Sequence, residues 1–311
     1  MPHIELNTVP GLLAHIPDPP KKLYAEGDIS LLMRDDVILV CIVGPRKASP
    51  YGRDVVDLVL RHLQRFNAVT VSGIAYGIDA IVHDTSIRLG IPTIAIPGSG
   101  IDDDVFYPRA HLDLKHEILD HGGLIVNEFD PLVRAAPFTF PVRNRLMAGM
   151  SHLTIVIEAE RKSGTLITAH LAADYGREVL VVPGSIFSLT SAGTHELAGK
   201  GATLLASLDV LTETLKLIAE RDGIELYKKE FEETESTETS DKVENITAIL
   251  ETLSKDERRI YDCVLSHANG MAKSDICRLL DMSTSEVSIY VTLLELHGVV
   301  RMRLGKVWAV V

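Results

Sequence analysis

Short apolar runs, most of them rich in β-branched residues, recur up to residue 182 of this 311-residue chain. They occupy residues 37–43, 69–71, 93–96, 124–127, 153–157 and 178–182, and glycine or serine follows most of them within a few positions. Runs this short and this apolar are typical of strands buried on both faces of a parallel sheet. Because helical patterns separate them, the sequence predicts an extended Rossmann-like α/β fold with a doubly wound, mostly parallel sheet.

The loops after these runs hold the first candidate binding residues. The carboxyl ends of parallel strands share one edge of a sheet, so the loops are expected to meet at one crevice, where open α/β sheets bind ligands. Glycine and serine in such loops leave backbone N–H groups accessible to an anion, although the same residues also serve in structural turns. The residues selected on this basis are Gly44, Arg46, Lys47, Ser72, Gly73, Gly77, Gly98, Ser163, Gly164 and Thr165.

A second set of candidates precedes the fifth apolar run. A polar turn containing Phe140, Arg143, Asn144 and Arg145 is predicted there, leading into a short helix-like segment. Arginine offers a planar fork to phosphate oxygens, and an aromatic ring offers a face on which a base stacks. Lys162, after the fifth run, adds a cation. The alternatives are a core position for Phe140, a turn-fixing role for Asn144 and a merely solvated Lys162.

The sequence predicts no catalytic residue, metal ligand or cofactor. Asp79 and His83 lie four residues apart on a predicted helix face, and we interpret them as a hydrogen-bonded structural pair. The other histidines lack metal-ligand spacing. The cysteines, at positions 41, 263 and 277, are far apart, which indicates free thiols in a reducing cytoplasm. No apolar run approaches the roughly 20 residues that a membrane span needs, so a cytoplasmic location is expected.

The formal net charge of −12 argues against a nucleic-acid partner when it is taken over the whole chain. Its distribution weakens that argument. Residues 221–243 are predicted to be an acidic, disordered linker. They include the serine- and threonine-rich acidic run 231–239, which is too poor in apolar residues to pack. Cations in the preceding part are instead grouped in loops, as at Arg46-Lys47 and Arg161-Lys162.

The predicted linker divides the chain into domains. Residues 1–36 are punctuated by prolines and predicted to be a short N-terminal extension, and 37–220 form the Rossmann-like domain. Residues 244–311 contain two capping-box patterns, Ser254 with Glu257 and Ser283 with Glu286, each of which opens a helical stretch. A short helix at 272–280 and two short strands around Gly305 complete the pattern of a winged helix.

The motifs of the first domain resemble, in order, those of the DNA-processing protein A family (DprA, also called Smf). The resemblance covers about residues 20–215. The matching stretches are Gly44-Pro45-Arg46, residues 72–79 with His83, 93–100 with Tyr107-Pro108, 140–145, 163–169, 183–185 and Gly201-Ala202. Three positions depart from the family pattern. Pro45 replaces a small polar residue, Tyr76 stands where arginine is common, and His195 stands where asparagine is common.

The resemblance implies a protein without enzymatic activity or cofactor. Members of the family are said to bind single-stranded DNA in a basic pocket of the Rossmann-like domain and to load RecA onto it, in DNA uptake or homologous recombination. The expected partners are therefore single-stranded DNA, RecA and a second copy of the chain in a homodimer. An apolar helical face within 204–218 serves either that pairing or the packing of the core.

Two other functions are weighed against this one. A related Rossmann group, similar to lysine decarboxylase-like phosphoribohydrolases, carries a glutamate where this chain has Thr168, and a threonine cannot replace a carboxylate in acid–base chemistry. The third hypothesis is a transcription regulator whose Rossmann part senses a nucleotide and whose winged helix binds duplex DNA. The candidate recognition helix, 284–296, contains no lysine or arginine, which favours an accessory or protein-contact role for the winged helix.

Overall fold

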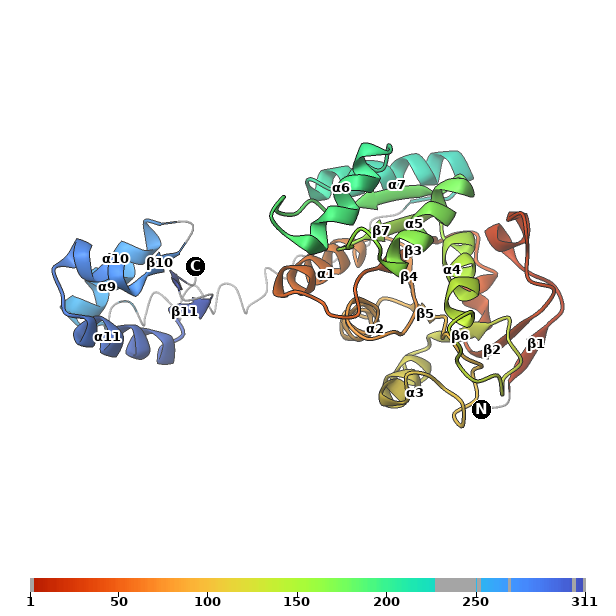
Figure 1. Cartoon of the computed structure of the whole chain (residues 1–311), viewed down its shortest axis with the longest axis horizontal. Helices are drawn as coiled ribbons and strands as arrows, with labels where there is room; N and C mark the ends of the chain where they lie inside the picture. Colours follow the sequence, from red (N-terminus) through yellow and green to blue (C-terminus); the bar gives the residue numbers. More distant parts are fainter. Residues whose placement is uncertain (1–2, 227–249, 251–252, 268–269, 304–305, 310–311) are drawn as a thin grey trace. The chain divides into compact units, whose positions relative to one another are not determined.

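The computed structural model describes residues 3–226, 250, 253–267, 270–303 and 306–309 of the chain (Figure 1). The chain divides into two compact units, Met1–Lys229 and Glu230–Val311, and each is described here by itself. Most of the predicted linker lies outside the described residues. Its expected start at 221 is wrong, because the last described helix of the first unit, α7 (Leu208–Asp222), runs past that point and Ile224, which follows it, is buried.

Within the described residues, the first unit is built on one nine-stranded sheet, with the order β1-β2-β6-β5-β4-β3-β7-β8-β9. All six apolar runs form strands of its parallel part, which confirms the predicted doubly wound fold. These strands are β3 (Ile38–Val43), β4 (Ala68–Ser72), β5 (Thr93–Ala95), β6 (Leu124–Asn127), β7 (Leu153–Val156) and β8 (Glu178–Val181). The two-residue strand β9 (Thr203–Leu204) extends the sheet beyond β8.

Helices cover both faces of this sheet, as the two-sided burial of its strands requires. On β3, Ile38, Val40 and Ile42 face one layer, while Leu39, Cys41 and Val43 face the other. The first layer contains α1 (Pro50–Leu63), α2 (Ile78–Arg88), α3 (Leu112–Asp120) and α7. The second contains α4 (Thr139–Met150), α5 (Gly164–Asp174) and α6 (Ala192–Gly199) (Figure 1).

The N-terminal residues are part of this domain, so their prediction as a separate extension is wrong. β1 (Ile4–Leu6) pairs with β2 (Leu23–Gly27), and β2 pairs antiparallel with β6 at the edge of the parallel part. The prolines of this segment lie in the connection between the two strands. Leu13 and Ile16, in that connection, are buried against α4.

The strand order reverses between β3 and β7. From β3 the chain adds β4, β5 and β6 in one direction, and it then returns to the other side of β3 to add β7, β8 and β9. The loops that leave β3 and β7 therefore diverge, and they open a crevice at the carboxyl edge of the sheet. This crevice is where the predicted loop residues were expected to meet.

The second unit confirms the predicted winged helix. Its described helices are α9 (Lys255–Leu265), α10 (Lys273–Leu280) and α11 (Thr284–Leu296). Both predicted capping boxes are formed, at Ser254 with Glu257 and at Ser283 with Glu286. Strands β10 (Met271–Ala272), β11 (Val300–Arg303) and β12 (Lys306–Ala309) form a small antiparallel sheet, while Gly305 at the predicted turn lies outside the described residues. Within the described part of the chain, no helix is long and apolar enough to cross a membrane.

Candidate functional site

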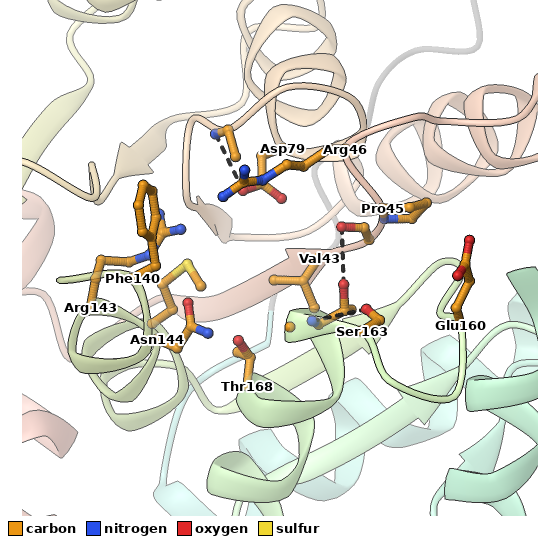
Figure 2. Close-up of a pocket in the computed structure, with 15 residues that line it drawn as sticks. Val43, Pro45, Arg46, Asp79, Phe140, Arg143, Asn144, Glu160, Ser163 and Thr168 are labelled. Atoms are coloured by element: carbon orange, nitrogen blue, oxygen red, sulfur yellow. Dashed lines mark hydrogen bonds between the residues drawn. The ribbon is translucent and has the colours of Figure 1, made fainter. Parts of the chain in front are cut away.

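A pocket of about 340 Å³ opens at the point where the strand order reverses. Figure 2 shows its walls, with Phe140, Arg143 and Asn144 of α4 on one side, and Thr168 of α5 and its capping residue Ser163 on another. It is lined by Val43, Gly44, Pro45, Arg46, Ala75, Asp79, Phe140, Arg143, Asn144, Met147, Glu160, Ser163, Gly164, Thr165 and Thr168. The predicted convergence is therefore observed for the loops after β3 and β7, together with one face of α4.

The loop after β3 presents Arg46 at the mouth of the pocket. Its guanidinium carbon lies 5.2 Å from the centre of the Phe140 ring. The start of α2 holds this loop in place, because Ile78 donates its N–H to the carbonyl of Pro45 at 3.2 Å. Gly77, with φ of +78°, is needed for this approach, since a Cβ there would lie 2.3 Å from the Pro45 carbonyl oxygen. Arg46 and the adjacent Lys47 are exposed, and within the described residues neither has an ion-pair partner.

The predicted polar turn is instead the beginning of α4. Thr139, Phe140 and Pro141 form its first turn, where proline is tolerated because the N–H groups of the first turn have no carbonyl partner within the helix. Phe140 faces the mouth of the pocket, and a Cβ at Gly98 would lie 2.4 Å from its ring. Asn144 is one turn further along the same helix face and is 8% exposed. Its amide faces the pocket and has no hydrogen-bond partner among the described residues.

Arg143 lines the pocket, but its guanidinium is engaged by the protein. It is 4% exposed, and its Nη1 donates to the backbone carbonyl of Gly73 at 2.6 Å and to that of Ile96. The carboxylate of Asp79 also approaches Gly73, at the position where a Cβ would lie. This geometry argues against the phosphate contact predicted for Arg143 and favours a role in joining α4 to the loops after β4 and β5. Gly73 itself is required because a side chain would collide with the guanidinium.

Arg145 lies outside the pocket lining, so the structure does not bring it together with Arg46 and Phe140. Its Nη2 forms an ion pair with Glu128, and its Nε lies 3.8 Å from Asp18. Residues two positions apart on a helix point about 200° away from each other, so Arg143 and Arg145 cannot both face one ligand. The spacing of the two arginines would have indicated this from the sequence if residues 139–150 had been recognised as a helix.

The N-terminus of α5 forms the wall opposite α4. Ser163 caps the helix by accepting a hydrogen bond from the Thr165 N–H at 3.0 Å, and Thr165 donates its hydroxyl to the Gly44 carbonyl at 3.1 Å (Figure 2). Gly164 faces open space. Thr168 is 1% exposed and lines the pocket, and its hydroxyl has no hydrogen-bond partner among the described residues. The helix end thus offers backbone N–H groups and a positive dipole to a ligand.

The remaining predicted residues are close to the pocket without lining it. Ser72 is fully buried and donates its hydroxyl to the Ile42 carbonyl at 2.7 Å, so it serves the packing of β4 on β3. Lys162 is exposed beside Arg161 in the loop after β7, and neither has an ion-pair partner in the part of the chain that the structure describes. Glu160, in the same loop, lines the pocket and was missed from the sequence.

The predicted pair of Asp79 and His83 is not formed. Asp79 accepts the N–H of Ala75 at 3.3 Å, whereas His83 Nδ1 lies 2.8 Å from the hydroxyl of Thr93. Burial raises the pKa of Asp79, an effect that the charge of Arg143 opposes. Burial also lowers the pKa of His83 to about 3, so its imidazole is neutral. Among the described residues, no three His, Cys, Asp or Glu side chains are grouped as a metal site would require.

Comparison with known proteins places this geometry in a family. Residues 3–216, which include every residue that lines the pocket, match the family described as DNA recombination-mediator protein A. The chain belongs to this family. The resemblance seen in the motifs is thereby confirmed, and the DNA-recombination family covers nearly all of the α/β unit.

Two curated members of the DNA recombination-mediator protein A family illustrate the match. DNA processing protein DprA of Bacillus subtilis is 37% identical over 206 residues, which cover 66% of this chain and 68% of that protein. The DprA of Streptococcus pneumoniae is 39% identical over 202 residues, covering 65% of this chain and 69% of that protein. Both are named as DNA-processing proteins. The winged helix lies outside the residues that match the family.

Two solved structures of the family have the same fold. The X-ray structure of DNA processing protein A from Streptococcus pneumoniae superposes with a TM-score of 0.62 at 38% identity, over 68% of this chain and 74% of that one. The Helicobacter pylori protein superposes with a TM-score of 0.60 at 31% identity, over 68% of this chain and 95% of that one. The latter structure concerns the single-stranded DNA binding mode of the Helicobacter pylori protein.

Proposed function

We propose that this protein binds single-stranded DNA at the pocket between α4 and α5. The observation that carries the proposal is a combination of three features at one edge of the sheet. Arg46, Lys47 and Lys162 are exposed cations without ion-pair partners among the described residues. Phe140 is an aromatic side chain at the mouth, and Asn144 supplies an open amide below it. Cations that follow a backbone and rings on which bases stack are the two components of single-strand binding.

The contact between Arg46 and Phe140 determines how a strand would enter. In the free protein the guanidinium lies over the ring, 5.2 Å from its centre, and covers the face that a base would use. Because the pocket contains both cations and the carboxylates of Asp79 and Glu160, a neutral base is better suited to its interior than a phosphate. We therefore assign the base to the side of Phe140 and Asn144 and the phosphates to Arg46, Lys47 and Lys162 at the rim.

We further propose that the bound strand is passed to a recombinase. The support is membership of the recombination-mediator family. The partners in this proposal are RecA, in the cytoplasm, and a second copy of this chain. When single-stranded DNA is already covered by single-strand-binding protein, adding this protein should shorten the delay before RecA hydrolyses ATP. No change in that delay, with single-strand binding intact, would limit the function to binding.

Fluorescence anisotropy with labelled single- and double-stranded oligonucleotides, over a range of salt concentrations, tests the binding proposal. We expect preference for single strands, little dependence on sequence, and affinity that falls linearly with salt on logarithmic axes because phosphate contacts release counterions. Arg46→Ala should lower the magnitude of that slope by about 0.7, the value for one phosphate contact on a single strand.

Lys216→Ala is the matched control. Lys216 lies on α7, beside His62 at the end of α1 and Phe66 just after it, and among the described residues its ion-pair partner is Glu213 on the surface. Its replacement removes the same charge at the opposite edge of the sheet, so the slope should not change. Equal slope changes in both variants would show a diffuse charge effect and contradict the assigned site. Absence of single-strand binding would overturn the proposed function.

A further inference from the structure

Two exposed tyrosines lie next to Phe140, outside the pocket. Tyr107 is 40% exposed, and its ring centre lies 5.9 Å from that of Phe140 with the planes at 73°. Tyr76 is 45% exposed. Both line a shallow hollow together with Arg46, Gly73, Ala75, Gly98, Pro108 and Phe140. Because Arg46, Ala75 and Phe140 also line the main pocket, the hollow continues from its mouth over the loops after β4 and β5.

Each tyrosine is held in place by neighbouring groups. The ring of Tyr76 packs edge-on against His111, with centres 4.8 Å apart, and His111 Nδ1 in turn lies 2.8 Å from the carbonyl of Ile74. The backbone N–H of Tyr107 donates to the hydroxyl of Ser99 at 3.0 Å. The rings are therefore presented from fixed loops, which lowers the entropy lost when a ligand contacts them.

The chemistry of the hollow favours a base over a phosphate. Arg46 is its only cation in the described residues that line it, and its other side chains are aromatic or small. The phenol hydroxyls of Tyr76 and Tyr107 have no hydrogen-bond partner among the described residues. An exposed ring with a free hydroxyl stacks on a base and bonds to its edge or to the next phosphate.

We propose that Tyr76 and Tyr107 form a second base-stacking site, which takes the nucleotide adjacent to the one at Phe140. The inference rests on the proposed single-strand function and specifies its extent: the strand leaves the pocket across the loops after β4 and β5, with consecutive bases on consecutive rings.

The test compares the affinities of two oligonucleotides that differ only in the number of bases available for stacking. One probe carries a single thymine flanked by abasic nucleotides, and a second carries two adjacent thymines in the same abasic strand. Because the phosphates are identical, the two probes differ only in base contacts. For the full-length protein we expect the second thymine to raise affinity about tenfold, within the range of one base–aromatic stack.

The full-length variant Tyr76→Leu/Tyr107→Leu should lose that tenfold gain while it binds the single-thymine probe as before, with an unchanged salt slope. Tyr76→Phe/Tyr107→Phe should retain most of the gain, which shows that the loops remain folded. Tyr175→Leu, at the residue that follows α5 and packs partly buried against the core, controls for the loss of a tyrosine elsewhere in the domain and should bind both probes as the parent protein does. A gain that persists in the leucine variant would overturn the second site alone. Failure of the parent protein to bind either probe would overturn the proposed function as well.

Discussion

Arg143 joins two layers of the site by donating a hydrogen bond from Nη1 to the backbone carbonyl of Gly73, at 2.6 Å. The same nitrogen also bonds to the carbonyl of Ile96, so one side chain of α4 holds the ends of β4 and β5. The side chain is 4% exposed and its Nε is buried without a hydrogen-bond partner, so it presents little surface to a phosphate. The arginine that appears most prominent in the sequence thus supports the pocket, and the exposed Arg46 is the one available to a ligand.

Arg143→Ala is expected to destabilise the protein without changing the salt dependence of DNA binding. It leaves two buried carbonyl groups without their donor, and each such group costs about 1–3 kcal/mol. Urea denaturation should show the loss, and anisotropy should show weaker binding with the logarithmic salt slope preserved. The result that would contradict this role is a slope reduced by about 0.7 in a variant of unchanged stability, because it would indicate a lost phosphate contact.

The strands of the parallel sheet, and the edge of the sheet at which the site forms, could be predicted from the sequence. Each buried strand is an apolar run between breakers, and the order of the loops follows from parallel pairing. The pairing of β1 with β2 was missed because a strand such as Ile4–Leu6 is short and partly polar. Prolines also interrupt the segment between the two strands. The other partner of β2, β6, lies about a hundred residues away, so no local pattern predicts the pairing.

Within the site, the sequence identified residue types but not their orientation. Arg46, Phe140, Asn144 and Thr165 line the pocket as predicted. Arg145 was expected beside them because adjacent cations in a turn point to one ligand, whereas in α4 it faces Glu128 on another side of the helix. Tyr107 was not selected, because it comes next to Phe140 only where the loop after β5 meets the start of α4, and the two residues are far apart in the sequence.

Two glycines of the site are expected to respond in opposite ways to alanine. At Gly98 a Cβ would lie 2.4 Å from the Phe140 ring, so Gly98→Ala should displace the ring and weaken single-strand binding much as Phe140→Ala does, with the salt slope preserved. At Gly164 the same atom meets nothing within 4 Å. Gly164→Ala should therefore keep or slightly raise the unfolding free energy, by up to about 1 kcal/mol for a helical position.

Binding by the Gly164→Ala variant is the informative measurement. If a strand approaches the N-terminus of α5 closely, the added methyl group should lower affinity although the fold is intact. Equal affinity in the parent protein and this variant would place the strand away from α5. Thermal unfolding of both variants separates these effects from a loss of folded protein.

Two buried histidines are expected to make the protein less stable in mild acid. Burial lowers the pKa of His83 to about 3 and that of His152 to about 4, from an ordinary value of 6.5. Their neutral forms are retained in the folded protein, so below pH 6.5 the unfolded chain binds more protons and stability falls as the pH decreases. Each histidine lowers the free energy of unfolding by roughly 1.4 kcal/mol per pH unit between pH 6.5 and its pKa in the folded protein.

Urea unfolding measured between neutral pH and the acid side tests this effect. The double variant His83→Gln/His152→Gln should show a shallower decline of unfolding free energy with falling pH, whatever its stability at neutral pH. The exposed His170 on α5 provides a control, since His170→Gln should leave the pH dependence of the parent protein unchanged. A decline of the same steepness in all three proteins would assign the acid sensitivity to carboxylates instead.

The winged helix is expected to contribute little to single-strand binding. Its helix α11 exposes apolar side chains, with Ile289 59%, Leu293 37% and Leu296 77% exposed, and its sequence contains no lysine or arginine. A recognition helix normally depends on such cations to neutralise phosphates. The exposed face of α11 is instead suited to contact with another protein, in line with the accessory role that the charges predict.

A chain that ends at Leu226 should therefore keep most of the single-strand affinity of the full-length protein. The cut follows α7 and the buried Ile224, and so keeps all the described residues of the first unit. At low salt the shortened chain should even bind slightly better, because the acidic run at 231–239 repels phosphate and is removed with the winged helix. Anisotropy at two salt concentrations measures both effects. If truncation weakens binding by more than about tenfold, a loss of some 1.4 kcal/mol, cations of the wing such as Arg301 and Lys306 must take part in the DNA site.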